Sequence, residues 1–154
     1  MESRQLKYIV AILLLAAVVS ATVCFTLVPR YRSILKDNWG VELPVFARLR
    51  QIYSCSNSGF HGDGLRFHSF SYRYEDYIEL MFAWGSFNRS TLFHSSIYEA
   101  AEAWMDELAV PLEQRPNLQS GALSHWYKAS DDSSELIILW NSEENMLYVL
   151  ESFL

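Results

Sequence analysis

The residues best suited to chemistry lie in one short glycine-rich segment, residues 58–64, which reads SGFHGDG. Its three glycines permit positive φ angles and close backbone approach, and His61 and Asp63 could present an imidazole beside a carboxylate. Such a pair can bind a metal, or act as a general base with its orienting acid. The structural alternative is a hairpin loop in which Asp63-Gly64 forms the turn. We take Phe60, His61 and Asp63 as the candidate functional loop.

The rest of the chain adds no partner to this loop at a recognisable spacing. His68, His94 and His125 would have to supply further metal ligands, yet none lies at a spacing typical of a metal site. No calcium loop, phosphate-binding loop, nucleophile elbow or Ser-His-Asp pattern is present in the sequence. Cys55 is expected to be a small buried residue rather than a nucleophile. We therefore assign no catalytic residue, no metal and no cofactor.

Two predicted strands flank the candidate loop and would position it. Residues 48–56 and 65–74 alternate between apolar and polar side chains, which predicts a β-hairpin with the glycine-rich segment as its connection. The apolar face changes phase between Phe67 and Phe70, which predicts an irregularity of the pairing near Ser69.

Two helices are predicted after the hairpin. Apolar residues at helical spacing over residues 74–82 predict a short helix that ends near residue 85 or 88. The second helix is expected to begin at Ser96, which forms a capping box with Glu99, and to stop before Pro111. Its apolar stripe comprises Ile97, Ala100, Ala101, Trp104 and Leu108, and its wet acidic face comprises Glu99, Glu102 and Asp106.

The last third of the chain alternates turns with apolar runs. Residues 124–129, 135–140 and 146–153 predict three strands of an antiparallel meander. Residues 136–140, LIILW, are too continuously apolar for an edge strand, so this strand should be central and covered by helices on one side. The predicted fold class is α+β, with roughly five antiparallel strands and two helices inserted after the first hairpin.

An apolar run near the N-terminus predicts a membrane anchor. Residues 8–28 contain no charge, proline or glycine, and at about 1.5 Å per residue they span the roughly 30 Å core of a bilayer. One alternative is a cleavable signal peptide, with Val19-Ser20-Ala21 as the cleavage site. We expect an uncleaved anchor, because the apolar run continues past that site. Lipid attachment at Cys24 is disfavoured, because Val23 precedes it where a small residue is required.

The anchor divides the chain into a short basic N-terminus at residues 1–7, the transmembrane helix at 8–28, a juxtamembrane segment at 29–40 and a globular domain at 41–154. Basic residues flank both ends of the helix, two before it and three after it, and this count mildly favours a cytoplasmic C-terminal side. Long C-terminal domains are translocated largely regardless of nearby charge, and we expect the domain to lie outside the cytoplasm.

Charge is divided sharply along the chain. Residues 37–154 carry 7 Lys or Arg against 17 Asp or Glu, whereas residues 1–36 carry 5 basic residues and 1 acidic residue. An acidic domain repels phosphate backbones, so we do not expect nucleic acid as a partner. We expect the basic residues beside the anchor to hold it at the lipid headgroups.

The turn at residues 59–64, together with the runs at 136–140 and 146–151, resembles a group of small membrane-anchored or exported bacterial proteins of unknown function. The resemblance implies one α+β domain behind an anchor at the cell membrane, and it implies no activity. Members of the group open this turn with His-Gly-Gly-Phe, whereas this chain has Asn57-Ser58-Gly59-Phe60. This departure weakens the interpretation of the loop as a conventional histidine-based site.

The sequence favours a non-enzymatic, single-pass membrane protein whose domain binds another protein. Aromatic residues make up 15% of the chain, enough for a core and a binding surface, and exposed aromatics near Phe60 would favour recognition. One alternative is a hydrolase or metal-dependent enzyme that uses His61 and Asp63. A second alternative is an immunity-type inhibitor whose acidic face neutralises a basic partner.

Overall fold

The computed structural model describes residues 31–57, 63–86 and 92–154, so the predicted anchor at residues 8–28 lies outside the described residues. Among the described helices, none combines the length and the apolar character that crossing a bilayer requires. The chain forms two compact units, residues 1–42 and residues 43–154. In the first unit, residues 31–39 are helical, and Lys36 forms an ion pair with Glu42.

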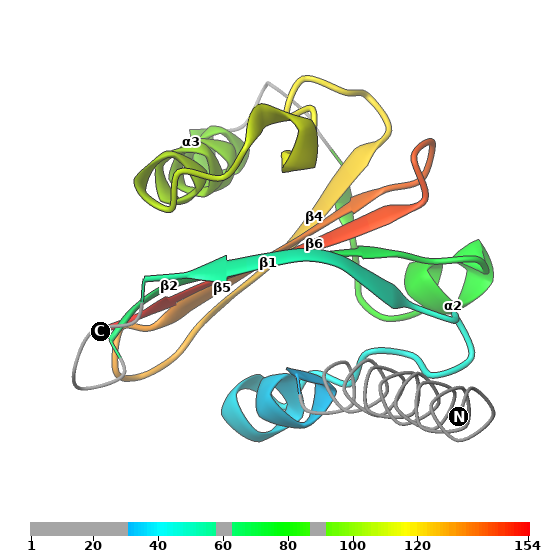
Figure 1. Cartoon of the computed structure of the whole chain (residues 1–154), viewed down its shortest axis with the longest axis horizontal. Helices are drawn as coiled ribbons and strands as arrows, with labels where there is room; N and C mark the ends of the chain where they lie inside the picture. Colours follow the sequence, from blue (N-terminus) through cyan, green and yellow to red (C-terminus); the bar gives the residue numbers. More distant parts are fainter. Residues whose placement is uncertain (1–30, 58–62, 87–91) are drawn as a thin grey trace, which may run out of the picture. The chain divides into compact units, whose positions relative to one another are not determined.

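The second unit is built on one antiparallel sheet with the strand order β1-β2-β6-β5-β4-β3 (Figure 1). Its five long strands agree with the predicted α+β class, and the two-residue strand β3 adds a short sixth strand at one edge. The strands are β1 Arg50–Ser56, β2 Gly64–Ser71, β3 Gly85–Ser86, β4 Leu123–Ala129, β5 Glu135–Asn141 and β6 Met146–Phe153. The helices are α2 Glu75–Glu79, α3 Leu92–Glu107 and the 3-10 turn η1 Leu112–Gln114.

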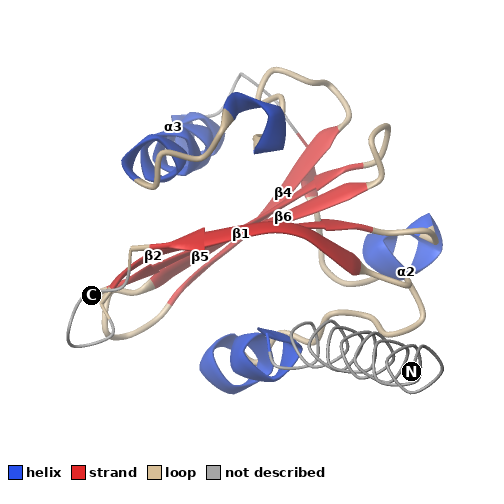
Figure 2. Cartoon of the chain, in the orientation of Figure 1, coloured by secondary structure: helices blue, strands red, loops and turns tan. Residues whose placement is uncertain are grey.

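Strand β5 is central, as the apolar run predicted. It pairs with β4 on one side and with β6 on the other, and Leu136 to Leu139 are almost fully buried. Helix α3 covers one face of the sheet (Figure 2), where Ala101 and Met105 pack with Ile137 and Leu139. The predicted meander of the last three strands is therefore confirmed, with its apolar faces in the core.

The predicted irregularity in the first hairpin is also confirmed. The register pairs Gln51 with Phe70 and Tyr53 with Ser69, so Ile52 is an extra residue on β1. Such a bulge reverses which face each side chain takes and increases the local twist. On β2 itself the pairing with β6 is continuous from Gly64 to Ser71, so Phe67 and Phe70 lie on opposite faces of the sheet, and the change of phase in the sequence arises because both faces of β2 are buried.

Both helices between the hairpin and the meander differ from their predicted bounds. Helix α3 begins at Leu92, so Ser96 lies inside the helix and the predicted cap at Ser96 is wrong. Helix α2 already ends at Glu79, and Gly85 pairs with His125 in the sheet instead of ending a helix. Gly85 and Ser86 are extended because their backbone pairs with β4. The periodicity of residues 74–82 could not predict this, because it contains no information about the pairing strand.

The C-terminal end of α3 closes in a left-handed turn. Ala109 has a φ angle of 50°, its N–H donates to the Asp106 carbonyl at 3.0 Å, and the Val110 N–H donates to the Met105 carbonyl at 2.9 Å. These two bonds form a Schellman motif, which satisfies carbonyl groups that would otherwise lack partners at the helix end.

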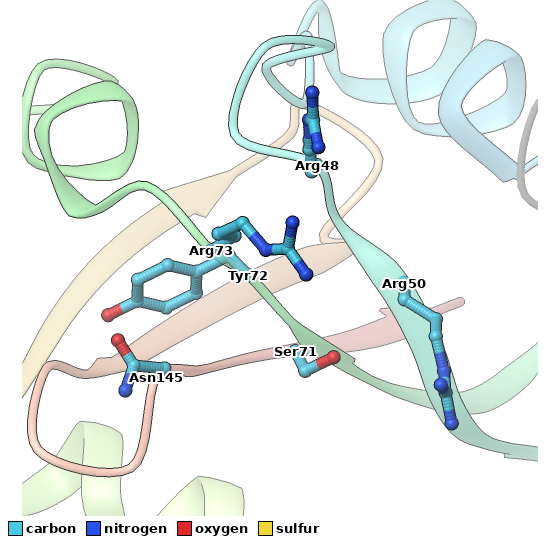
Figure 3. A pocket seen from close by; sticks show the side chains of 6 residues that line it. All are labelled: Arg48, Arg50, Ser71, Tyr72, Arg73 and Asn145. Atoms are coloured by element: carbon cyan, nitrogen blue, oxygen red, sulfur yellow. The ribbon is translucent and has the colours of Figure 1, made fainter.

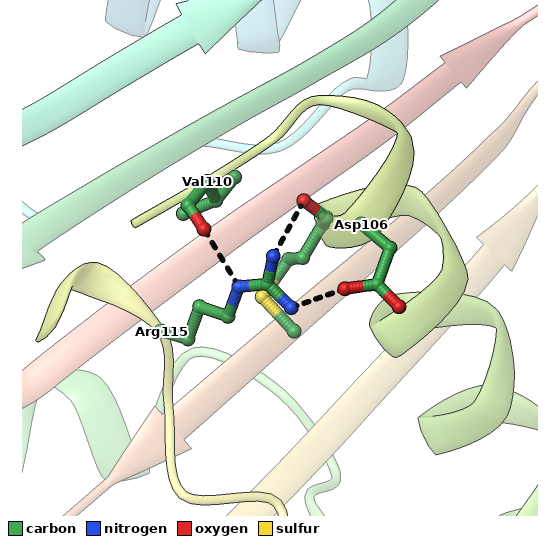
Figure 4. A network of polar contacts seen from close by, with 4 residues as sticks. Asp106, Val110 and Arg115 are labelled. Atoms are coloured by element: carbon green, nitrogen blue, oxygen red, sulfur yellow. Dashed lines mark hydrogen bonds and ion pairs between the residues drawn. The ribbon is translucent and has the colours of Figure 1, made fainter. Parts of the chain in front are cut away.

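Arg115 adds a second closure at the same helix end (Figure 4). Its Nε donates to the Val110 carbonyl at 2.8 Å, its Nη2 to the Met105 carbonyl at 3.2 Å, and its Nη1 to Asp106. We expect Arg115→Ala to lower the free energy of unfolding by about 2 kcal/mol, because two half-buried carbonyls lose a charged donor. Arg115→Lys should recover less than half of this loss, since one ammonium cannot reproduce the guanidinium fork.

Urea unfolding of the full chain in an uncharged detergent, followed by tryptophan fluorescence, measures this difference. The matched control is Arg50→Ala, because the exposed Arg50 side chain makes no hydrogen bond or ion pair within the described part of the chain. We expect that control to change the free energy by less than about 0.5 kcal/mol. An equal loss in the two variants would show that Arg115 does not stabilise the helix end.

Candidate functional site

The predicted functional loop connects β1 to β2, but most of it lies outside the described residues. Phe60 and His61 fall in the segment that the structure does not describe, whereas Asp63 is described and exposed just before β2. Asn57 fixes the base of the loop: its Oδ1 accepts the Leu65 N–H at 2.6 Å, and its Nδ2 donates to Glu107 at 3.0 Å. The assignment of Phe60, His61 and Asp63 remains a prediction.

The other histidines do not form a site together. His68 lies on β2 and His125 on β4, with β6 and β5 between them, which corresponds to about 14 Å across the sheet. His125 is buried, and its Nδ1 lies 3.3 Å from the hydroxyl of Tyr98. His94 belongs to α3, and its side chain is outside the described part. Within residues 31–57, 63–86 and 92–154, the structure has no cluster of three or more potential metal ligands.

Cys55 is a half-buried residue of β1 with a free thiol. Burial raises the pKa of this thiol, an effect that a hydrogen bond with Tyr53 opposes. Because the thiolate is the nucleophilic form, a raised pKa leaves little of it at neutral pH. Cys55 therefore lacks the lowered thiol pKa that activates a catalytic cysteine.

Exposed apolar side chains gather at one place in the second unit, which we call the aromatic surface: Val45, Phe46, Tyr74 and Tyr77. Phe46 is 71% exposed and Val45 66%, while Tyr77 and Tyr74 are 44% and 42% exposed. The Phe46 and Tyr77 ring centres lie 5.9 Å apart, and those of Tyr74 and Tyr77 lie 6.5 Å apart. Exposed apolar groups that contact one another, rather than being scattered singly, make this surface a candidate binding surface.

Local structure places these side chains outward. Residues 45–48 form a turn in which the Arg48 N–H donates to the Val45 carbonyl at 3.3 Å, and the Arg73 N–H donates to the Ala47 carbonyl at 3.0 Å. Ala47 is fully buried, and the turn therefore points Val45 and Phe46 toward solvent. In α2, Ile78 is fully buried and therefore turns Tyr77 outward.

The aromatic surface also carries one charge of each sign. Arg48 and Asp76 line a shallow cavity of about 500 Å³ together with the four apolar residues. The Arg48 guanidinium lies 5.7 Å from the centre of the Tyr74 ring, in cation–π geometry. Aromatic anchors with charges beside them are typical of protein recognition sites, in which Trp, Tyr and Arg dominate the binding energy.

The aromatic surface lies at the opposite end of the β1–β2 hairpin from the predicted loop. Arg50 pairs with Ser71 near the aromatic surface, whereas Ser56 pairs with Arg66 near the loop. The exposed aromatics of the described chain therefore lie at the opposite end of the hairpin from Asn57 and Asp63, the described residues on either side of the loop. Sequence reasoning missed this surface, although an apolar pair directly after Pro44, in a turn, was a detectable signal.

Comparisons with known protein families, with curated proteins and with solved structures find no match to this chain. The resemblance of the turn and the two apolar runs to small membrane-anchored or exported bacterial proteins remains a prediction. Any statement of function must therefore come from the surfaces of the chain itself.

Proposed function

We propose that this protein is a single-pass, membrane-anchored binding module whose globular domain lies outside the cytoplasm and recognises a protein partner without catalysing a reaction. The observation that carries the proposal is the aromatic surface, in which Phe46 is 71% exposed and contacts Tyr77. The anchor at residues 8–28 is the basis for the cellular location.

The energetics of the aromatic surface suit recognition. An aromatic side chain buries roughly 150–250 Å², so covering the exposed parts of Phe46 and Tyr77 would contribute a few kcal/mol at about 25 cal/mol per Å². Their contact with each other also limits the entropy lost on binding. A complementary partner would offer an apolar patch with a carboxylate opposite Arg48 and a cation opposite Asp76.

Side-chain contact fits this domain better than addition of a partner strand. β1 is an edge strand, and in the described chain no strand pairs with its outer side. The bulge at Ile52 interrupts its row of backbone groups, and such bulges protect edges from strand addition. The partner should therefore contact the aromatic surface rather than the β1 edge.

Site-specific photocrosslinking in cells tests the proposal on the full-length chain. With benzoylphenylalanine at position 46 or 77, we expect one discrete adduct, because these side chains would lie against the partner. A probe at Leu112, which is 81% exposed outside the aromatic surface, is the matched control and should give no such adduct. Phe46→Ser should reduce the adduct from position 77 at least tenfold, as a lost hot spot of about 2 kcal/mol requires.

Two outcomes would contradict the proposal: equal crosslinking from position 112, or no adduct from position 46 and position 77. The immunity-type alternative places a basic partner on the exposed acidic face of α3 instead. A third probe at Glu102, which is exposed on that face, separates this alternative from the proposal in the same experiment.

A further inference from the structure

Three arginines border one open cavity beside the aromatic surface (Figure 3). The cavity has a volume of about 560 Å³, which is within the usual range for small-molecule sites. Its lining consists of Arg48, Arg50, Ser71, Tyr72, Arg73 and Asn145. Every one of these side chains can donate a hydrogen bond, and none is acidic.

This grouping is unusual for so acidic a domain. Residues 37–154 contain only seven basic residues against 17 acidic ones, and three of the seven border this cavity. Within residues 31–57, 63–86 and 92–154, the structure gives these three arginines no ion pair and no side-chain hydrogen bond. The cavity lining has three positive charges and no acidic residue, so the like charges repel one another, and a bound anion would reduce that repulsion.

The backbone holds the arginines together from three neighbouring positions. Arg50 begins β1 and pairs with Ser71 of β2, and Arg73 follows two residues after Ser71. Arg48 has a left-handed φ angle of 53°, and the bond from the Arg73 N–H to Ala47 draws the two segments together. In Figure 3, the Arg73 guanidinium points into the space between Arg48 and Arg50, whose side chains extend outward.

The other walls supply fixed groups. The Tyr72 hydroxyl donates to the Asn141 carbonyl at 3.3 Å and accepts the indole N–H of Trp140, so its ring is a rigid side of the cavity. The Tyr72 N–H donates to the Asn145 carbonyl at 3.0 Å, which places the Asn145 amide beside the opening. The Ser71 hydroxyl lies between Asn145 and Arg50 in the same view.

We propose that this cavity is a binding site for a phosphate-bearing ligand, with the phosphate oxygens held by Arg73 and by Arg48 and Arg50 as they turn inward. A guanidinium matches a phosphate in two-pronged geometry, and hydroxyl and amide groups complete the oxygen shell. The cavity is larger than a bare phosphate ion requires, so the ligand carries its phosphate on a larger group. This site adjoins the aromatic surface and shares Arg48 with it, but Arg50 and Arg73 line only the arginine cavity, so substitutions at these two residues test the site apart from the proposed function.

The phosphate can come from two sources, a lipid headgroup or a soluble phosphate ester. Only residues 29–47 separate the predicted anchor from Arg48, so membrane headgroups are within reach of the domain. Both sources offer the same charged oxygens to the arginines. They differ in whether acyl chains accompany the phosphate, and the test uses this difference.

The test is calorimetric titration of the full-length chain in an uncharged maltoside detergent. The probes are inorganic phosphate, glycerol 3-phosphate and dihexanoyl phosphatidic acid, with dihexanoyl phosphatidylcholine as the zwitterionic control. We expect saturable binding of glycerol 3-phosphate or of phosphatidic acid that is at least tenfold tighter than binding of phosphatidylcholine. Preference for phosphatidic acid identifies the lipid source, and equal affinity for glycerol 3-phosphate identifies the soluble one.

Arg50→Gln and Arg73→Gln, made singly, should each weaken binding at least tenfold, because each removes one charged contact. The matched control is Arg66→Gln, which removes the same charge from the other end of the hairpin, where the guanidinium lies 4.4 Å from the Phe153 ring centre. The control should change the affinity less than twofold. The proposal would be overturned if no phosphate probe bound saturably, or if Arg66→Gln lost as much affinity as Arg50→Gln and Arg73→Gln. Neither result would change the crosslinking expected from position 46, which tests the proposed function separately.

Discussion

Acidification from pH 7 to pH 4 is expected to lower the free energy of unfolding by about 2–3 kcal/mol through His68 alone. Burial in β2, and secondarily the positive charge of Arg66, lower the pKa of His68 to about 4. In the unfolded chain a histidine titrates near pH 6.5. Between these two values the unfolded state binds more protons than the folded state, so stability falls as the pH falls through this window. The folded state is half protonated at pH 4, and only below about pH 3 are both states fully protonated, so that this contribution no longer changes.

The comparison of wild type with His68→Gln isolates this effect from the carboxyl groups, which titrate near the lower end of the same window. Urea unfolding of both chains at pH 7 and pH 4 gives four free energies, and the difference between the two pH-induced losses belongs to His68. We expect the variant to lose about 2–3 kcal/mol less than wild type. Identical losses in the two chains would show that His68 is solvated in the folded state.

The elements with the strongest sequence patterns were predicted best. β6 has the predicted bounds, Met146–Phe153, because its continuous apolar run begins directly after the polar turn at residues 142–145. β5 was predicted to be central because its continuous apolar run leaves neither face suited to solvent exposure. The start of α3 at Leu92 was missed because the Ser96 and Glu99 pattern is a cap only where no helical turn precedes it.

The aromatic surface could not be predicted from local patterns. Tyr74 and Tyr77 have helical spacing, which indicates an apolar face but not whether anything covers that face. Phe46 lies 31 residues before Tyr77, and the two meet only because the β1–β2 hairpin returns the chain to the same end of the sheet. The arginine cavity depends on the same return, since Arg73 reaches Arg48 and Arg50 through the pairing of β1 with β2.

Gly85→Ala is expected to lower the free energy of unfolding by about 2–3 kcal/mol. Gly85 lies opposite His125 in the pairing of β3 with β4, and an added Cβ would lie 2.7 Å from both Cε1 and Nε2 of the imidazole. The ring cannot move away easily, because it is buried and its Nδ1 lies 3.3 Å from the Tyr98 hydroxyl. Overpacking against a fixed side chain typically costs about 1–3 kcal/mol.

A double-mutant cycle with His125→Ala separates this clash from a general weakening of β3. If the imidazole is the obstacle, Gly85→Ala should cost less than about 0.5 kcal/mol in the His125→Ala background, because the smaller side chain leaves room for the methyl group. Gly121→Ala is the matched control, since a Cβ at Gly121 would meet no atom within 4 Å. An undiminished cost of Gly85→Ala without the imidazole would mean that the backbone of β3, and not His125, requires glycine at this position.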